Sequence, residues 1–238
     1  MLGGESSPSE LYTTAWSVVA GAQAGGPQSQ AYLERLIKTY WKPAYYYARR
    51  RGMDHHAAAD CIQEFFTRML AGDWLANVDP NRGRFRGWLL TALRRWVSRN
   101  RTATGIDRVT LVNDDVVRAY EQEDQQANPD DLFNKAWARS CLDEAMRQME
   151  EEQAGGSREK HVAVFKFYLA HAAEHGAPPS YDVLAERYDV PVTSITNYLH
   201  RARTMFRDYL LRVVRETVGD PKEAELELYD LRRYLAQA

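Results

Sequence analysis

The chain has 238 residues, of which 45% are hydrophobic and 27% charged. These proportions are ordinary for a globular protein and exclude collagen, disorder along the whole chain and a disulfide scaffold. Cys61 and Cys141 lie far apart in the sequence, which excludes a cysteine-based zinc motif and indicates a reducing compartment, here the cytoplasm. Because there is no apolar run near ~18 residues and no signal-peptide pattern at the start, we expect no membrane insertion.

Charge is unevenly distributed. Residues 41–108 contain 13 Lys and Arg against 6 Asp and Glu, whereas residues 109–155 contain 4 against 12. A basic segment of this kind favours a polyanionic partner, although chance clustering of surface charge is an alternative. The acidic stretch between Asn113 and Pro129 indicates a solvated linker.

Apolar residues recur at helical spacing along most of the chain. The first such segment lies around residues 33–40, and Pro43 is expected to interrupt it. Further helices are predicted over 55–71, 85–101, 132–149 and 162–173. The apolar face of the segment 55–71 consists of Ala58, Cys61, Ile62, Phe65, Met69 and Leu70. No strand-like alternation is found, so the predicted class is all-α, with two small helical domains joined by the acidic linker.

Two short helices follow near the C-terminal side. Ser180 is a natural N-cap for the first, and Asp189 stands where the turn requires a left-handed residue. Together they predict a helix-turn-helix unit. The polar face of the second helix suits DNA recognition in the major groove, with a plain helical hairpin as the alternative. This face comprises Thr193, Ser194, Thr196, Asn197, His200, Arg201, Arg203, Thr204 and Arg207.

The segment 85–101 is a second candidate for binding nucleic acid. One sector of its helical wheel carries polar and basic side chains, and three arginines surround its start. Such a stripe beside aromatic residues suits single-stranded nucleic acid, whereas Trp88 and Trp96 can equally be core residues. The candidates are Arg82, Arg84, Arg86, Trp88, Thr91, Arg94, Arg95, Ser98 and Arg101.

Three stretches together resemble bacterial RNA polymerase sigma factors of the extracytoplasmic-function group. Tyr40–Arg51 with Asp60–Phe66 resembles the first half of sigma region 2, and Gly83–Leu93 resembles its second half. Tyr181–Leu211 resembles region 4. The lead-in Thr13–Val19 and the long acidic tail are similar to a larger subset of the group, common in planctomycetes and related bacteria.

The resemblance implies a non-enzymatic protein without a cofactor, with core RNA polymerase and double- and single-stranded promoter DNA as partners. Asp60, Gln63, Glu64 and Phe65 would dock on the clamp helices of the β′ subunit, and region 4 would lie near the β flap. The segment 85–101 and its preceding loop would open the −10 element, which includes extruding a base. The helix 193–207 would recognise the −35 element. An anti-sigma factor or another regulator is a further possible partner.

The expected organisation follows from these matches. It comprises an N-terminal extension 1–29, a region 2-like domain 30–102, an acidic linker 103–131, a region 4-like domain 132–218 and a C-terminal tail 219–238. The linker would pass near the active-site and RNA-exit channels of the polymerase.

Two positions depart from the family pattern. Pro191 replaces the usual serine N-cap of the recognition helix, and proline has no hydroxyl with which to cap it. Thr196 and Tyr198 are neutral where the family tends to carry Lys or Arg. Fewer phosphate contacts and a shallower salt dependence are therefore expected.

Other functions remain open from sequence. A stand-alone helix-turn-helix regulator explains 180–215 but leaves 40–101 without a role, and an adaptor or sigma-sequestering protein needs no arginine stripe. An enzyme would need a metal site built on the helical pairs His55–His56 with Asp60, or His171 with His175, and neither pair has a third ligand in a motif. The leucines of the tail 219–238 would pack on a neighbouring domain or bind a partner, and a role in gating promoter binding is a hypothesis.

Overall fold

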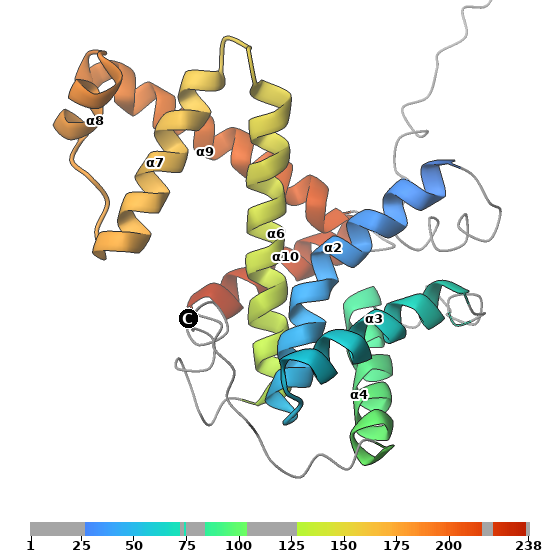
Figure 1. Ribbon diagram of the computed structural model, residues 1–238. Helices are drawn as coiled ribbons and strands as arrows, with labels where there is room; N and C mark the ends of the chain where they lie inside the picture. Colours follow the sequence, from blue (N-terminus) through green and yellow to red (C-terminus); the bar gives the residue numbers. More distant parts are fainter. Residues whose placement is uncertain (1–26, 72–73, 75–83, 104–127, 216–220, 237–238) are drawn as a thin grey trace, which may run out of the picture. The chain divides into compact units, whose positions relative to one another are not determined.

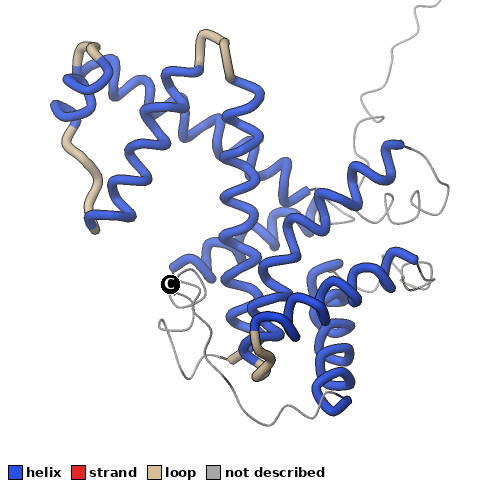
Figure 2. Tube along the Cα trace, in the orientation of Figure 1, coloured by secondary structure: helices blue, strands red, loops and turns tan. Residues whose placement is uncertain are grey.

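Figure 1 shows a computed structural model of the chain, which describes residues 27–71, 74, 84–103, 128–215 and 221–236. Within these ranges all regular elements are α-helices and no strand occurs (Figure 2). The predicted all-α class is confirmed for the described residues. Residues 1–26 and 104–127, with Arg82 and most of the expected acidic linker, lie outside them.

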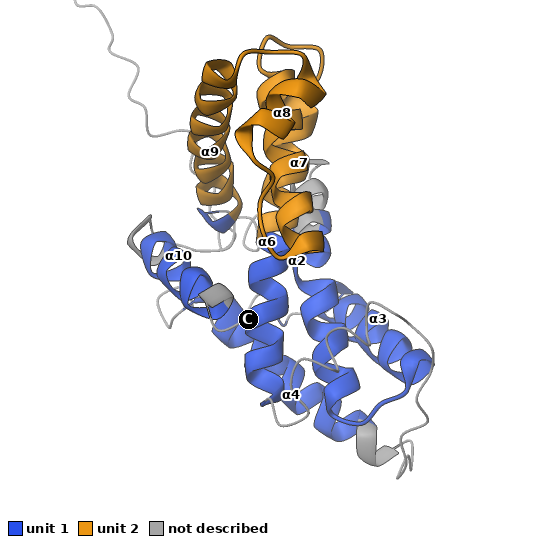
Figure 3. Ribbon diagram, turned by 90° about the vertical axis from the view of Figure 1, so that its left-hand side faces the viewer, with its two compact units in different colours: residues 1–141, 214–238 blue, residues 142–213 orange. Residues whose placement is uncertain are grey.

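The chain forms two compact units (Figure 3). Unit 1 comprises residues 1–141 and 214–238, and unit 2 comprises residues 142–213. The division lies inside one helix, whereas the sequence pattern placed a boundary between 103 and 131. The tail 219–238 belongs to unit 1 and is therefore not grouped with residues 180–207.

Unit 1 is built from helices that are distant in sequence. The described helices are α2 (Pro27–Arg50), α3 (His55–Ala71), α4 (Phe85–Ala103), the first part of α6 (Pro129–Gln153) and α10 (Pro221–Ala236). α2 packs against α3 and α4. Tyr40 of α2 is fully buried and contacts Phe85 of α4 at 5.6 Å and Phe133 of α6 at 6.3 Å between ring centroids. Aromatic burial around this ring therefore joins three helices.

Pro43 does not interrupt the first helix, contrary to the sequence-based prediction. α2 continues from Pro27 to Arg50 with Pro43 inside it. A proline in a helix interior costs about 3 kcal/mol. Burial of large side chains on both sides of it, including Tyr40 and Tyr47, offsets this cost.

The predicted apolar face of α3 is largely correct. Ala58, Cys61, Ile62, Phe65 and Met69 are buried. Leu70 was expected on this face but is 39% exposed, and Phe66 is buried in addition. The Phe66 ring lies 5.9 Å from the Trp41 ring of α2, so packing against α2 adds Phe66 to the buried face of α3. Across the other side, the Trp96 indole of α4 donates a hydrogen bond to the carbonyl oxygen of Cys61 at 3.0 Å.

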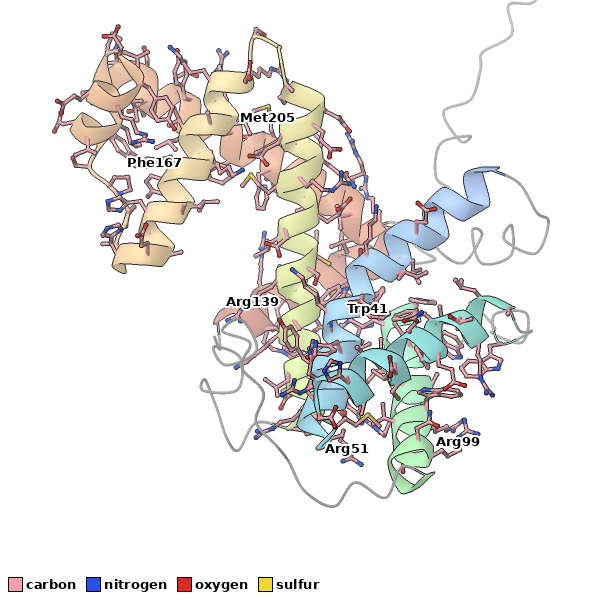
Figure 4. The ribbon with its side chains drawn as sticks, in the orientation of Figure 1. Trp41, Arg51, Arg99, Arg139, Phe167 and Met205 are labelled. Carbon is pink, nitrogen blue, oxygen red and sulfur yellow. The ribbon has the colours of Figure 1, made fainter. Side chains whose placement is uncertain are left out.

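Unit 2 contains the second part of α6 with α7 (Glu159–His175), α8 (Tyr181–Tyr188) and most of α9 (Val192–Arg215). α7 ends at Gly176, whose φ of 72° is a left-handed conformation that glycine adopts without a Cβ clash. Phe167 projects from α7 towards α8 (Figure 4), and its ring lies 6.4 Å from that of Tyr188. Phe165 contacts Phe206 of α9 at 5.6 Å.

The capping and turn conformations predicted for Ser180 and Asp189 are confirmed. The Val183 amide donates to Ser180 Oγ at 3.3 Å, which caps α8. Asp189 ends α8 with φ 50° and ψ 60°, the left-handed conformation. Pro191 directly precedes α9, and its carbonyl oxygen accepts from the Ser194 amide at 2.8 Å. The backbone of Pro191 thus takes part in the first turn without a side-chain cap.

We expect Phe65→Ala to lower the free energy of unfolding of unit 1 by about 3–5 kcal/mol, because Phe65 is fully buried. Gln63→Ala, on the exposed side of α3, should change it by less than about 0.5 kcal/mol. Urea unfolding followed by tryptophan fluorescence reports on unit 1 alone, since all six tryptophans lie in its residues. Equal losses in the two variants would contradict this packing.

Candidate nucleic-acid interface

A cluster of charged side chains surrounds the N-terminus of α4. Arg86 donates through Nη2 to Glu227 of α10 at 2.6 Å and to Asp230 at 2.9 Å. Its Nε donates to the same Glu227 oxygen, Oε2, at 3.0 Å and to Oε1 at 3.3 Å, and its Nη1 donates to Asn134 of α6. Arg84 donates to Asp230 at 2.7 Å. We call these five residues the Arg86 cluster.

The Arg86 cluster is buried at its centre. Arg86 is 6% exposed and Glu227 is 1% exposed. The guanidinium carbon of Arg86 lies 4.3 Å from the centroid of the Trp137 ring and 5.5 Å from that of Tyr234. These aromatic faces stabilise the cation where water is excluded.

The pKa values of Arg86 and Asp230 are shifted by their neighbours in the cluster. Burial acts to lower the pKa of Arg86, but the charge and hydrogen bonds of Glu227 outweigh it, so the pKa is raised. Burial acts to raise the pKa of Asp230, but hydrogen bonding and attraction to Arg84, with the charge of Arg86, lower it below its usual value. The ionised forms of Arg86 and Asp230 are therefore favoured in this buried setting.

The other candidates on α4 lie at its surface. Thr91, Arg94, Arg95 and Ser98 are exposed, and Trp88 is half-buried against Phe85 at 5.5 Å. Arg94 forms an ion pair with Asp130 at the start of α6. Arg99, beside them, lies on the outer side of α4 (Figure 4), and its Nε donates to the Arg95 carbonyl oxygen at 3.4 Å. The Arg101 side chain lies outside the described residues. Trp96 is 6% exposed and belongs to the core, as the alternative interpretation held.

Arg86 is placed differently from the other stripe residues. As a buried member of the cluster it offers no surface to a ligand in this conformation, whereas Arg84 is half-buried. Glu227, Asp230 and Asn134 were not predicted from the sequence to belong to a site. The pattern that could have indicated Glu227 and Asp230 is their position between the apolar residues Ala224, Leu231 and Tyr234. All three apolar residues are buried.

The polar face of α9 is presented to solvent. Among its predicted residues, Ser194 is half-buried and the others are exposed. The exposed ones are Thr193, Thr196, Asn197, His200, Arg201, Arg203, Thr204 and Arg207. Ile195, Leu199 and Ala202 on the opposite side are fully buried. The helix is thus anchored along one face and displays hydrogen-bonding groups along the other.

Side chains of α9 contact both α7 and α6 within unit 2. The Arg203 guanidinium lies 5.4 Å from the Tyr168 ring centroid. Tyr198 is half-buried, with its ring 4.4 Å from that of His161. Tyr198 thus packs against α7, which explains a neutral aromatic residue at one of the two positions where a basic residue was expected. Glu152 of α6 accepts from Tyr209 at 2.8 Å and pairs with Arg212 at 2.6 Å, fixing the later turns.

The predicted polymerase-binding edge of α3 is divided by burial. Asp60, Gln63 and Glu64 are exposed, and Glu64 pairs with Arg68 at 2.7 Å. Phe65 is fully buried between helices and contacts Trp96 at 6.2 Å. It therefore supports the edge from within and offers no contact surface in this conformation.

The two histidine pairs considered as metal ligands make other contacts in the structure. Tyr45 Oη lies within hydrogen-bonding distance of His55 Nδ1, at 2.8 Å, and His171 and His175 stack at 4.1 Å between ring centroids. Among the described residues, no group of three or more His, Cys, Asp or Glu is arranged to hold a metal ion. None of the described helices is long and apolar enough to cross a membrane.

Comparison with known proteins gives one match. Residues 36–103 match the family model of sigma-70 region 2, which spans most of α2, all of α3 and all of α4. This supports placing the segment in the sigma-70 family. No curated protein and no solved structure matches the chain. The resemblance of residues 36–103 is therefore supported independently, whereas this match does not extend to residues 181–211.

We expect unit 2 to lose stability as the pH falls below about 6.5. Burial lowers the pKa of His161, and the nearby cations Arg201 and Arg158 lower it further. The folded unit therefore resists a proton that the unfolded chain takes up near its ordinary pKa of about 6.5. Stability is full above that pH and declines below it.

Hydrogen exchange of the α7 amides between pH 5.5 and 7.5, corrected for intrinsic rates, measures this effect. His161→Gln should flatten the dependence, and His200→Gln, at an exposed position of α9, should leave it unchanged. A dependence that persists in His161→Gln would rule out His161 as its origin.

Proposed function

We propose that the chain is a sigma factor that binds core RNA polymerase and directs transcription initiation from promoters with −10 and −35 elements. The observation that carries this proposal is the match of α2–α4 to sigma-70 region 2. The extracytoplasmic-function subtype, including the larger subset found in planctomycetes, is part of the proposal. A basic stripe and a helix-turn-helix in one chain agree with two separate DNA contacts.

The proposed contact with polymerase is the exposed edge of α3. Asp60, Gln63 and Glu64 present acidic and amide groups on successive turns of one helix. Polar groups of this kind form the rim of protein–protein interfaces and define the orientation of docking. The clamp helices of the β′ subunit are the proposed partner of this edge.

The proposed −10 contact is the outer face of α4. Arg94 and Arg95 supply charge for phosphates, and Thr91 and Ser98 supply hydroxyl groups. Trp88 is half-buried, so part of its ring is available for stacking with an unpaired base. Extruding a base costs a few kcal/mol of stacking, which contacts of this kind offset.

The proposed −35 contact is the exposed face of α9 in the major groove. Asn197, His200 and Arg203 occupy adjacent turns of this face and carry groups that hydrogen-bond to base edges. Thr193 and Thr196 lie near the helix N-terminus, where amide groups favour phosphate. Direct readout and backbone contact are thus available on one surface.

Size-exclusion chromatography with bacterial core RNA polymerase tests the proposal. We expect a stable one-to-one complex that Asp60→Arg weakens and Asp143→Arg, at an exposed site on α6, leaves intact. Failure of both the full chain and residues 1–218 to bind core would overturn the proposal. It would favour a stand-alone helix-turn-helix regulator.

Arg95→Ala should weaken binding of the polymerase complex to promoter DNA and make it less dependent on salt. Removing one phosphate contact on a single strand lowers the slope of log affinity against log salt by about 0.7. Lys38→Ala, an exposed cation on α2, is the matched control and should leave the slope unchanged. Fluorescence anisotropy between about 50 and 200 mM salt measures the slope in both variants. Equal slopes in the two variants would remove Arg95 from the contact.

Thr196→Lys should strengthen −35 binding. Thr196 is exposed on the proposed DNA face, at a position where sigma factors tend to carry a basic residue. One added contact to duplex phosphate steepens the salt slope by about 0.9. Glu186→Gln, at an exposed position of α8, changes the net charge by the same single unit and is the matched control. An equal gain from both variants would indicate a general charge effect.

A further inference from the structure

α10 presents two carboxylates to the start of α4. Glu227 and Asp230 lie one turn apart and both contact Arg86, and Asp230 also contacts Arg84 at 2.7 Å. Ala224, Leu231 and Tyr234 are buried with them. Thus α10 is docked by an apolar face with a pair of acids within it.

The two arginines that α10 occupies were both predicted to bind promoter DNA. Carboxylate and phosphate present the same paired oxygens to a guanidinium group. With Glu227 and Asp230 on one side, Asn134 on another and Trp137 against the ring plane, the hydrogen-bonding groups of Arg86 are satisfied internally. A phosphate reaches Arg86 only if α10 moves away.

The described aromatic contacts at the centre of unit 1 do not depend on α10. Tyr40 of α2 contacts both Phe85 of α4 and Phe133 of α6. Phe65, Trp74 and Trp96 form a second group on α3, α4 and the turn between them. Release of α10 therefore leaves these contacts in place, and the outer side of α10, with Leu226 58% and Tyr229 67% exposed, is already solvated.

We infer that α10 is an internal competitor of promoter DNA, in which Glu227 and Asp230 occupy the place of phosphates on Arg84 and Arg86. The inference rests on the proposed function, since that function brings DNA to α4. In the docked state the two arginines are neutralised and α4 offers DNA only its outer stripe. In the released state both arginines join the contact. Because linkage is reciprocal, DNA binding must release α10 to the same extent that α10 weakens DNA binding.

Hydrogen exchange of the wild-type chain in its polymerase complex tests this reciprocity. The complex is measured alone and with a promoter fragment identified by sequencing the 5′ ends of RNA made by the full chain with core polymerase. We expect the amides of 224–234 to exchange faster once promoter DNA is bound, while those of α3 do not. A promoter complex in which α10 stays equally protected would overturn the inference and leave the proposed function intact. Failure to form any promoter complex would overturn both.

Glu227→Gln tests the competition from the other side. It removes one buried carboxylate from Arg86 and should raise promoter affinity about fivefold or more, the lower range of coupling between linked sites. Glu225→Gln removes the same charge from the exposed side of α10 and is the matched control. The gain should be seen only with Glu227→Gln.

Glu227→Gln leaves the buried Arg86 cation less well paired and can therefore unfold unit 1. A second variant keeps the test valid in that case. Leu231→Ala weakens the docking of α10 through its apolar face and keeps every charge of the Arg86 cluster. It should also raise promoter affinity, with unit 1 still folded by tryptophan fluorescence. Unchanged or weaker affinity in a folded Leu231→Ala variant would show that α10 is a structural strap and would overturn the inference.

Discussion

A buried guanidinium group requires hydrogen-bonding and charged partners on every side. The arrangement of helices around Arg86 in unit 1 follows from this requirement. The charge of Arg86 is balanced by Glu227 and Asp230, its Nη1 donates to Asn134, and the guanidinium carbon lies over the rings of Trp137 and Tyr234. Removing one partner of a buried pair costs about 3–5 kcal/mol, because the other charge stays buried. This single requirement brings together the start of α4, the first part of α6 and the C-terminal helix.

The same interaction links structure to the proposed function. An arginine held by carboxylates is a site made for a paired-oxygen anion, and promoter DNA is a polymer of such anions. Where α10 provides the anions itself, the start of α4 is satisfied before any DNA arrives. The outer stripe with Arg94 and Arg95 remains exposed, so a first contact with DNA does not require α10 to move.

In unit 2 the exposed polar face of α9 is determined by the side chains on its opposite, buried face. Ile195, Leu199 and Ala202 are fully buried and fix the rotation of α9, which places the exposed polar residues together on the opposite side. The left-handed Asp189 and the Ser180 cap define where α8 ends and begins. Tyr198 packs on His161, so one expected basic position serves the packing of the unit.

Local patterns predicted much of this architecture. The bounds of α3, the cap at Ser180, the turn at Asp189 and the exposed face of α9 follow from spacing and residue chemistry, which act within a few residues. The passage of α2 through Pro43 and the burial of Phe66 were not predicted, because both depend on packing between helices. The pairing of Arg86 with Glu227 joins residues 141 positions apart, and no periodicity within one helix reveals it.

The measurement that tests the central claim most directly is transcription by core RNA polymerase with and without the chain on genomic DNA from its own source, with sequencing of the RNA 5′ ends. The account predicts start sites that appear only when the chain is present and share two sequence elements at the −10 and −35 positions. A set of start sites unchanged by the chain, under conditions where core polymerase responds to another sigma factor, would contradict it.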